Sequence, residues 1–161
     1  METFEKFAHK MGYEISRHYM EPSPISNGST MLPALALSFS PEPEKLSEVR
    51  RLIEQAACQT PLHRDRIEDL LSAFDEGIGN AIRHGCTIRN CRLYVMCQSL
   101  PDSLIVTIQD EGTGFMVPDA FQMPDPFAER GRGLPLMRIL TDEVRVHSGP
   151  TGTTVILTMH F

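Results

Sequence analysis

The chain has 161 residues, of which 41% are hydrophobic, and carries a formal net charge of -6 from 15 basic and 21 acidic side chains. This length suits one domain with a single core, and the acidic balance argues against direct binding to nucleic acid or to an anionic membrane. No apolar run reaches the roughly 20 residues of a membrane-spanning helix, and charged residues interrupt the start where a signal peptide needs an apolar stretch, so we expect a cytoplasmic protein.

The first 33 residues differ in pattern from the rest of the chain. Apolar positions are scattered from Phe4 to Met20, and the following segment, Glu21–Ser29, is rich in the Pro, Ser and Gly that break helices. We therefore predict an accessory N-terminal arm over residues 1–33 and one domain over residues 34–161.

The domain is predicted to begin with one strand and two helices. Apolar and small residues alternate from Leu35 to Phe39, as in a half-buried strand. The spacing of apolar residues then predicts a helix from about Glu44 to Cys58. A longer apolar stripe predicts a second helix from Arg64 to about His84, closed by Gly85.

The second half is predicted to contain four strands, one short helix and a long loop. Strand-like runs at Arg92–Gln98 and Leu104–Gln109 flank a turn with Pro and Asp, which predicts an antiparallel hairpin. A stretch rich in Gly, Pro and Asp follows from Asp110 to Gly133, and its length is typical of a lid or binding loop. The chain then ends with a helix over Leu134–Leu140 and two strands over Val144–Ser148 and Thr154–Phe161.

These elements predict an α+β fold. About five strands, mostly antiparallel, require helices on one face to complete a core. The expected architecture is therefore a two-layer α/β sandwich.

The four cysteines are expected to be reduced. They have neither CxxC spacing nor the density of a disulfide-stabilised domain. Because they lie in apolar or mixed segments, we expect free thiols and no zinc site at Cys58, Cys86, Cys91 and Cys97.

The second helix carries a polar pair beside its apolar stripe. Glu76 and Asn80 are four residues apart and share a face, with His84 one turn further. Gly77 and Gly79 each cost roughly 1 kcal/mol of helix propensity, which indicates that a backbone or a ligand approaches closely. Taken alone, the polar pair also fits an ordinary solvated face.

Two glycine-containing segments strengthen the signal. DEGTGF at residues 110–115 ends a strand with an acid and continues into two glycines, which permit positive φ and close ligand approach. GRGL at residues 131–134 precedes a helix, whose free N–H groups and dipole favour phosphate, and Arg130 and Arg132 add positive charge. Either segment alone fits a turn or a linker, so it is their occurrence together that indicates a ligand-binding site.

In this order the three segments resemble the motifs of the GHKL ATPases, which have the histidine kinase-like (Bergerat) ATP-binding fold. EGIGNAIRHG at residues 76–85 resembles the N box, DEGTGF the first glycine box and GRGL the second. The flanking sequences GRGLPLMRILTDEV and, at residues 152–159, GTTVILTM are most similar to the bacterial anti-sigma factor serine kinases. The resemblance covers about Leu35 to Phe161.

The resemblance implies ATP and Mg²⁺ as cofactors and assigns a role to each matched residue. Glu76 would be the general base for a partner's hydroxyl, and Asn80 would hold the Mg²⁺ that bridges the phosphates. Asp110 would accept a hydrogen bond from the adenine amino group, supported by Thr153. The loops around the nucleotide would contain Gly112, Gly114, Gly131, Gly133 and Leu134, with Arg130 or Arg132 neutralising the terminal phosphate.

The same resemblance implies an ATP-dependent serine/threonine protein kinase that acts as an anti-sigma factor in transcription regulation. It would bind a sigma factor or a related regulator, phosphorylate an anti-sigma factor antagonist and form a homodimer. One alternative is a non-catalytic ATP-binding module, against which Glu76 argues mildly. Another is the catalytic domain of a histidine kinase, although residues 1–33 leave little room for the dimerisation hairpin that such domains follow.

One position departs from the family pattern. The serine kinases commonly have Ser before the N-box Glu, whereas this chain has Asp75. This second carboxylate either raises the pKa of Glu76 or simply faces solvent.

Overall fold

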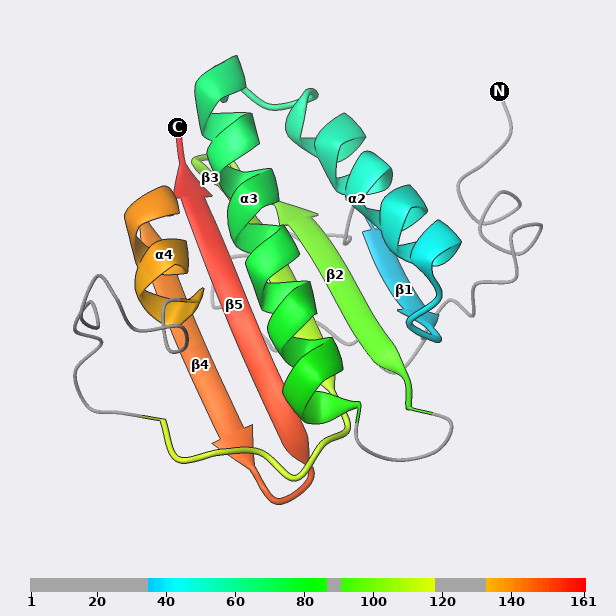
Figure 1. Cartoon of the computed structure of the whole chain (residues 1–161). Helices are drawn as coiled ribbons and strands as arrows, with labels where there is room; N and C mark the ends of the chain where they lie inside the picture. Colours follow the sequence, from blue (N-terminus) through cyan, green and yellow to red (C-terminus); the bar gives the residue numbers. More distant parts are fainter. Residues whose placement is uncertain (1–34, 87–90, 118–132) are drawn as a thin grey trace, which may run out of the picture.

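A computed structural model describes the fold over residues 35–86, 91–117 and 133–161. Within these residues, a five-stranded sheet carries helices on one face only (Figure 1). The predicted α+β two-layer sandwich is therefore confirmed. The arm predicted at residues 1–33 lies outside the described residues, so the domain boundary stays a prediction.

The described strands are antiparallel at every pairing, in the order β1-β2-β3-β5-β4. β2 and β3 form the predicted hairpin, and β4 and β5 form a second one that closes where Gly149 pairs with Gly152. This second hairpin places β5 beside β3 and leaves β4 at the edge. The strands are β1 Leu35–Phe39, β2 Leu93–Ser99, β3 Ser103–Asp110, β4 Glu143–Gly149 and β5 Gly152–His160.

Three α-helices cover the same face of the sheet (Figure 1). They are α2 Pro43–Ala57, α3 Arg64–Asn80 and α4 Gly133–Leu140. Pro43 starts α2, because a proline in the first turn loses no hydrogen bond that the helix needs. α2 lies over β1 and β2, α3 over the centre of the sheet, and α4 beside α3 on the β4 side (Figure 1).

The long second helix extends as predicted but changes geometry near its end. After Asn80, the π-helical turn η2 Ala81–Gly85 continues it. The amide of Cys86 then bonds to the carbonyl of Ala81, 3.0 Å away, and the helix stops. Such wide turns within helices are frequent at functional sites, and this one follows the polar pair directly.

The core lies between α3 and the central strands. The apolar stripe of α3 is buried, as its spacing predicts, and fully buried side chains such as Leu70 contribute about 1.5–3 kcal/mol each. Gly77 lies in the same stripe, where a Cβ atom would be 2.6 Å from Ile108 Cδ1 of β3 and 3.6 Å from Met137 Sδ of α4. This glycine therefore lets α3 approach the sheet and α4 closely, as its cost in helix propensity indicates.

The expectation of four reduced thiols is wrong for two of them. Cys86 and Cys91 form a disulfide, with their Cα atoms 5.1 Å apart. A spacing of five residues gives no such signal in the sequence. Cys58 and Cys97 are free; Cys58 is exposed, whereas burial raises the pKa of Cys97 to about 12.

None of the helices in the described ranges has the length and apolar character that a bilayer span requires.

Candidate functional site

Glu76 and Asn80 form one end of the candidate site, on the face of α3 that is turned towards α4. The first residue of α4, Gly133, packs directly against them. A Cβ atom at this position would overlap Glu76 Oε1 and lie 2.7 Å from Asn80 Nδ2. The glycine therefore lets α4 begin in direct contact with both side chains, which places the positive end of that helix beside both groups.

Arg83, in η2, joins the same two side chains. Its Nη2 donates to Asn80 Oδ1 at 2.9 Å and to Glu76 Oε1 at 3.2 Å. The two oxygen atoms therefore converge on one position, which a cationic nitrogen fills.

The donor set at this end suits a hard cation. An amide oxygen and a carboxylate oxygen that face one point, next to solvent, are chemically appropriate for Mg²⁺, which prefers oxygen ligands and keeps several waters. Asn80 is the residue that would hold the metal, and bound phosphates would supply other oxygens. Glu76 is 28% exposed in its side chain and stays accessible to a third group, such as a hydroxyl.

Asp110, the last residue of β3, forms the other end of the candidate site. It is only 4% exposed, and its Oδ1 accepts hydrogen bonds from the amides of Gly112, at 2.9 Å, and Thr153, at 3.1 Å. Both of these hydrogen bonds use Oδ1, and neither uses Oδ2. Every fully buried side-chain oxygen of the described residues has a hydrogen-bond partner. Oδ2 has none among these residues, so it is not fully buried and is a free acceptor at the surface.

Glycines close around this carboxylate. A Cβ atom at Gly85 would overlap the carboxyl carbon of Asp110, and one at Gly112 would lie 3.0 Å from its Oδ1. Gly114 has a φ of 68°, and its Cα faces the backbone of Gly149, which a side chain would overlap. The first glycine box is therefore packed between the end of η2 and the β4–β5 turn.

A short chain of hydrogen bonds ties this loop to the β4–β5 hairpin. Ser148 Oγ accepts from the amide of Phe115 at 2.8 Å and lies 3.0 Å from Thr153 Oγ1. Thr153 is 7% exposed, and its own amide holds Asp110. Sequence reasoning identified Thr153 but missed Ser148, although its hydroxyl joins the two segments.

One helix connects the two ends. Glu76 and Gly85 are nine positions apart, which is roughly 13 Å at 1.5 Å per residue. Glu76 and Asn80 face α4, and Gly85 abuts Asp110. The N-box segment therefore runs along the whole candidate site.

Asp75 belongs to a different surface. Its carboxylate pairs with Arg50 of α2, with Oδ2 2.9 Å from the arginine Nε. Both side chains are about half exposed. The departure from the family's serine is therefore accommodated by a partner on α2, on a different side of α3 from Gly133.

The structure brings most of the predicted site residues into two groups. Glu76, Asn80 and Gly133 meet at one end, and Leu134 follows Gly133 and packs against the core. Asp110, Gly112, Gly114 and Thr153 gather at the other end. Arg130, Gly131 and Arg132 lie outside the described residues, so their phosphate contacts stay predictions.

Sequence reasoning missed two further residues of these groups. Gly85 was predicted to end the helix and was the last residue of the N-box match, but it received no role in the site; its lack of a side chain makes room for Asp110. Arg83 received no role, although positions three after Asn80 and seven after Glu76 share their helix face. The spacing itself was the signal that could have identified Arg83.

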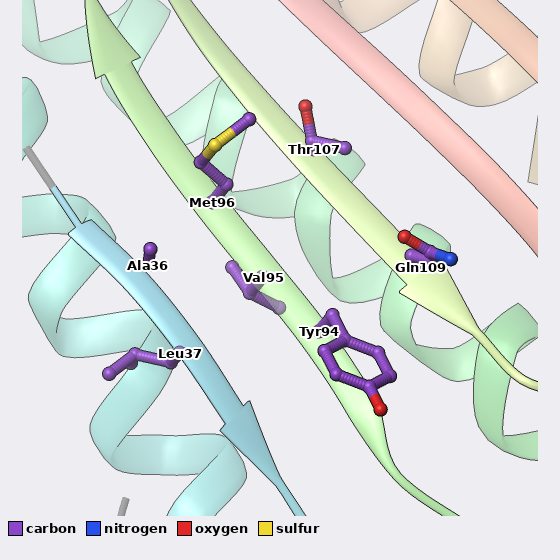
Figure 2. Close-up of a pocket in the computed structure, with 7 residues that line it drawn as sticks. All are labelled: Ala36, Leu37, Tyr94, Val95, Met96, Thr107 and Gln109. Carbon is purple, nitrogen blue, oxygen red and sulfur yellow. The ribbon is translucent and has the colours of Figure 1, made fainter. Parts of the chain in front are cut away.

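A separate hollow lies on the face of the sheet opposite the described helices. It spans β1, β2 and β3, with the helices behind the sheet in Figure 2. The phenol of Tyr94 at its rim donates to Glu111 Oε1 at 2.6 Å, and this bond raises the pKa of Tyr94. The hollow does not include the polar pair of α3; it is lined by Ala36, Leu37, Tyr94, Val95, Met96, Thr107 and Gln109.

Comparisons with known proteins identify the family of the chain. Residues 39–159 match the profile of the family described as the histidine kinase-like ATPase domain. The serine-protein kinase RsbW of Bacillus velezensis is 31% identical over 142 residues, which cover 82% of this chain and 88% of that protein. The anti-sigma F factor of Halalkalibacterium halodurans is 30% identical over 131 residues, covering 77% of this chain and 90% of that protein.

A solved structure agrees in fold. The structure of the RsbU and RsbW domains of Rv1364c from Mycobacterium tuberculosis aligns with a TM-score of 0.58 and 19% identity. The alignment covers 80% of this chain and 32% of the other. From the matched profile and the relatives at about 30% identity, this chain belongs to the histidine kinase-like ATPase domain family, together with RsbW kinases and anti-sigma F factors.

Proposed function

We propose that this protein is an ATP-dependent serine/threonine protein kinase that acts as an anti-sigma factor. It binds a sigma factor or a related regulator and phosphorylates an anti-sigma factor antagonist. The names of its relatives, serine-protein kinase and anti-sigma F factor, support both halves of this proposal. The observation that carries it is the convergence of Glu76 Oε1 and Asn80 Oδ1 on one position at the start of α4.

Each end of the site has one task in this proposal. Asp110 recognises adenine through the free acceptor Oδ2, since Oδ1 already holds two backbone amides. Asn80 holds Mg²⁺ at the phosphates, and the metal supplies charge neutralisation there when it is bound. The N-terminus of α4 and the second glycine box, with Arg130, Gly131 and Arg132, cradle the phosphates.

Glu76 acts as the general base. A carboxylate beside the phosphate position can orient the hydroxyl of a partner's serine or threonine and accept its proton. Its side chain is partly exposed, so a second protein can present that hydroxyl from outside. A module that only binds ATP has no use for a carboxylate in this place.

The test compares Glu76→Gln and Asn80→Ala with the wild-type protein. Each is incubated with labelled ATP, Mg²⁺ and a candidate antagonist, and both nucleotide binding and label transfer are measured. We expect Glu76→Gln to bind ATP and transfer at least about 100-fold more slowly, as loss of a general base predicts. Asn80→Ala should lose the Mg²⁺-dependent part of ATP binding.

The outcomes separate the candidate functions. Tight ATP binding without any transfer by the wild type favours the non-catalytic module. Label on a histidine of this chain itself favours the histidine kinase. Wild-type behaviour of both variants contradicts the site assignment.

We also propose a homodimer in the cytoplasm, with the ATP-binding unit confined to residues 34–161. Light scattering coupled to size exclusion measures the mass directly. A particle of one 18.1 kDa chain would contradict the dimer.

A further inference from the structure

Arg83 is held at the centre of the polar end of the site. One nitrogen, Nη2, donates both to Asn80 Oδ1 at 2.9 Å and to Glu76 Oε1 at 3.2 Å. The guanidinium therefore neutralises the candidate base and occupies the oxygen of the candidate metal ligand. The proposed reaction gives this residue no task.

The same contacts are weak enough to be exchanged. The side chain of Arg83 is 59% exposed, and exposed ion pairs contribute about 0–1 kcal/mol. Gly79 does not clamp the guanidinium, since even an added Cβ atom would lie at an ordinary van der Waals distance, 3.5 Å, from its nearest nitrogen. Arg83 can therefore leave both oxygens at small cost.

A guanidinium and a divalent metal ion cannot share these oxygens. Both are cations, so they repel each other at contact distance, and each needs Asn80 Oδ1 as an acceptor or ligand. Whichever is present excludes the other from that atom.

We propose that Arg83 is a resident counter-cation that substitutes for Mg²⁺ until the metal–nucleotide complex binds. In the metal-free protein, Arg83 neutralises Glu76 and Asn80 and offers its charge to an incoming phosphate. When the metal occupies the site, Arg83 releases Asn80. This inference rests on the proposed function, because it assumes that ATP and Mg²⁺ meet at Asn80.

The proposal predicts different effects of Arg83 with and without metal. Without metal, loss of the arginine removes the only counter-cation that the described residues offer at these oxygens, so ATP should bind more weakly. At saturating Mg²⁺ the arginine has left Asn80, and its loss should matter little. A thermodynamic cycle then requires the ATP complex of the variant to bind Mg²⁺ more tightly by the same factor.

The experiment measures ATP binding by calorimetry with the full chain, in EDTA and over a range of Mg²⁺ concentrations. Arg83→Met is compared with the wild type and with Arg50→Met, which removes an exposed arginine that pairs with Asp75 of α3. For Arg83→Met we expect the Kd in EDTA to rise about two- to fivefold, the fold-change that corresponds to an exposed ion pair. The half-saturating Mg²⁺ concentration should fall by the same factor, and Arg50→Met should match the wild type.

Three results would overturn the inference or the function beneath it. Equal Mg²⁺ dependence in Arg83→Met and wild type, with normal ATP binding by both, refutes the role of Arg83 alone. A higher Mg²⁺ requirement in Arg83→Met shows that the arginine helps to bind the metal complex and also refutes exchange. Failure of the wild type to bind ATP at any Mg²⁺ concentration refutes the proposed function itself.

Discussion

The two ends of the candidate site are built differently. At the Asp110 end, a buried carboxylate is fixed by two backbone amides and enclosed by glycines on neighbouring segments. At the Glu76 end, the polar side chains are partly exposed and are held by one arginine that solvent also reaches. The first end is part of the folded core, whereas the second is a surface that can rearrange.

In the proposed function, this contrast separates nucleotide recognition at Asp110 from phosphoryl transfer at Glu76. A fixed acceptor between rigid backbone segments can select a flat, uncharged group, because the site does not have to reorganise, at a cost in free energy, when that group binds. A phosphoryl-transfer centre must instead admit a nucleotide, a metal and a second protein in turn. Substitutions at the Asp110 end should therefore reduce stability, and substitutions at the Glu76 end should change ligand binding while leaving the fold intact.

Asp110→Ala should have the largest effect on stability. It leaves the buried amides of Gly112 and Thr153 without an acceptor, and each such loss costs about 1–3 kcal/mol, so we expect unfolding free energy to fall by about 4 kcal/mol. Urea denaturation followed by circular dichroism measures this change. Asp110→Asn is the control, because its amide oxygen can still accept from both amides; we expect it to lose less than half as much.

The outcome also tests the role of Asp110 in recognition. Asp110→Asn should stay folded and bind ATP more weakly, since an amide group replaces the free acceptor Oδ2. Unchanged stability of Asp110→Ala would mean that the two amides find other partners and that this end is less rigid than the geometry implies.

Gly85→Ala should be the next most damaging. Its new methyl group would overlap the carboxyl group of Asp110, and overpacking of this kind costs about 1–3 kcal/mol. Gly149→Ala is a matched control, because none of the described atoms lies within 4 Å of the position that its new methyl group would take. If thermal unfolding shows the same midpoint for both variants, the close packing around Asp110 is not what limits stability.

Loss of the Cys86–Cys91 disulfide should have a comparable or smaller effect. The bond closes a loop of six residues directly after Gly85, and loop-closure entropy gives a stabilisation of about 2 kcal/mol. The double variant Cys86→Ser/Cys91→Ser should unfold at lower urea concentration than the oxidised wild type. A reducing agent should shift the wild type to the same midpoint and leave the variant unchanged.

Alkylation of the native protein checks the disulfide itself. Without reductant, only Cys58 should react, since Cys97 is buried and its pKa of about 12 keeps the thiol protonated at neutral pH. Mass analysis counts the added groups. Labelling of Cys86 and Cys91 under these conditions would restore the expectation that both are reduced.

The sequence predicted the elements more completely than the contacts between them. Apolar periodicity located α3 and the strands to within a few residues, because burial of one face determines both spacing and position. The pairing of Thr153 with Asp110 joins residues 43 positions apart, and only the family resemblance indicated it. The disulfide depends on how the chain leaves η2, which no local pattern encodes, whereas the contacts of Arg83 follow from its helical spacing to Glu76 and Asn80.

Gly77 and Gly79 also show that the sequence pattern does not predict which contacts a residue makes. Helix propensity alone predicts close approach at both, yet the structure explains only Gly77, which lies against Ile108 and Met137. Gly79 faces the guanidinium of Arg83, which would lie at an ordinary van der Waals distance, 3.5 Å or more, from an added Cβ atom. A pattern of residue types could not distinguish a core contact from an open one.

Gly79→Ala should therefore have the smallest effect, and of opposite sign. Alanine improves helix propensity by up to about 1 kcal/mol, and nothing among the described residues obstructs the methyl group, so we expect a small rise in unfolding free energy. Gly77→Ala, whose methyl group would meet Ile108 at 2.6 Å, should fail to gain this stability. ATP binding by the two variants gives the decisive contrast: a stabilised Gly79→Ala that binds ATP normally assigns the close approach to Gly77 alone. A stabilised Gly79→Ala with weakened ATP binding would instead show that Gly79 is kept for the ligand, at the end of the site where exposed side chains can move.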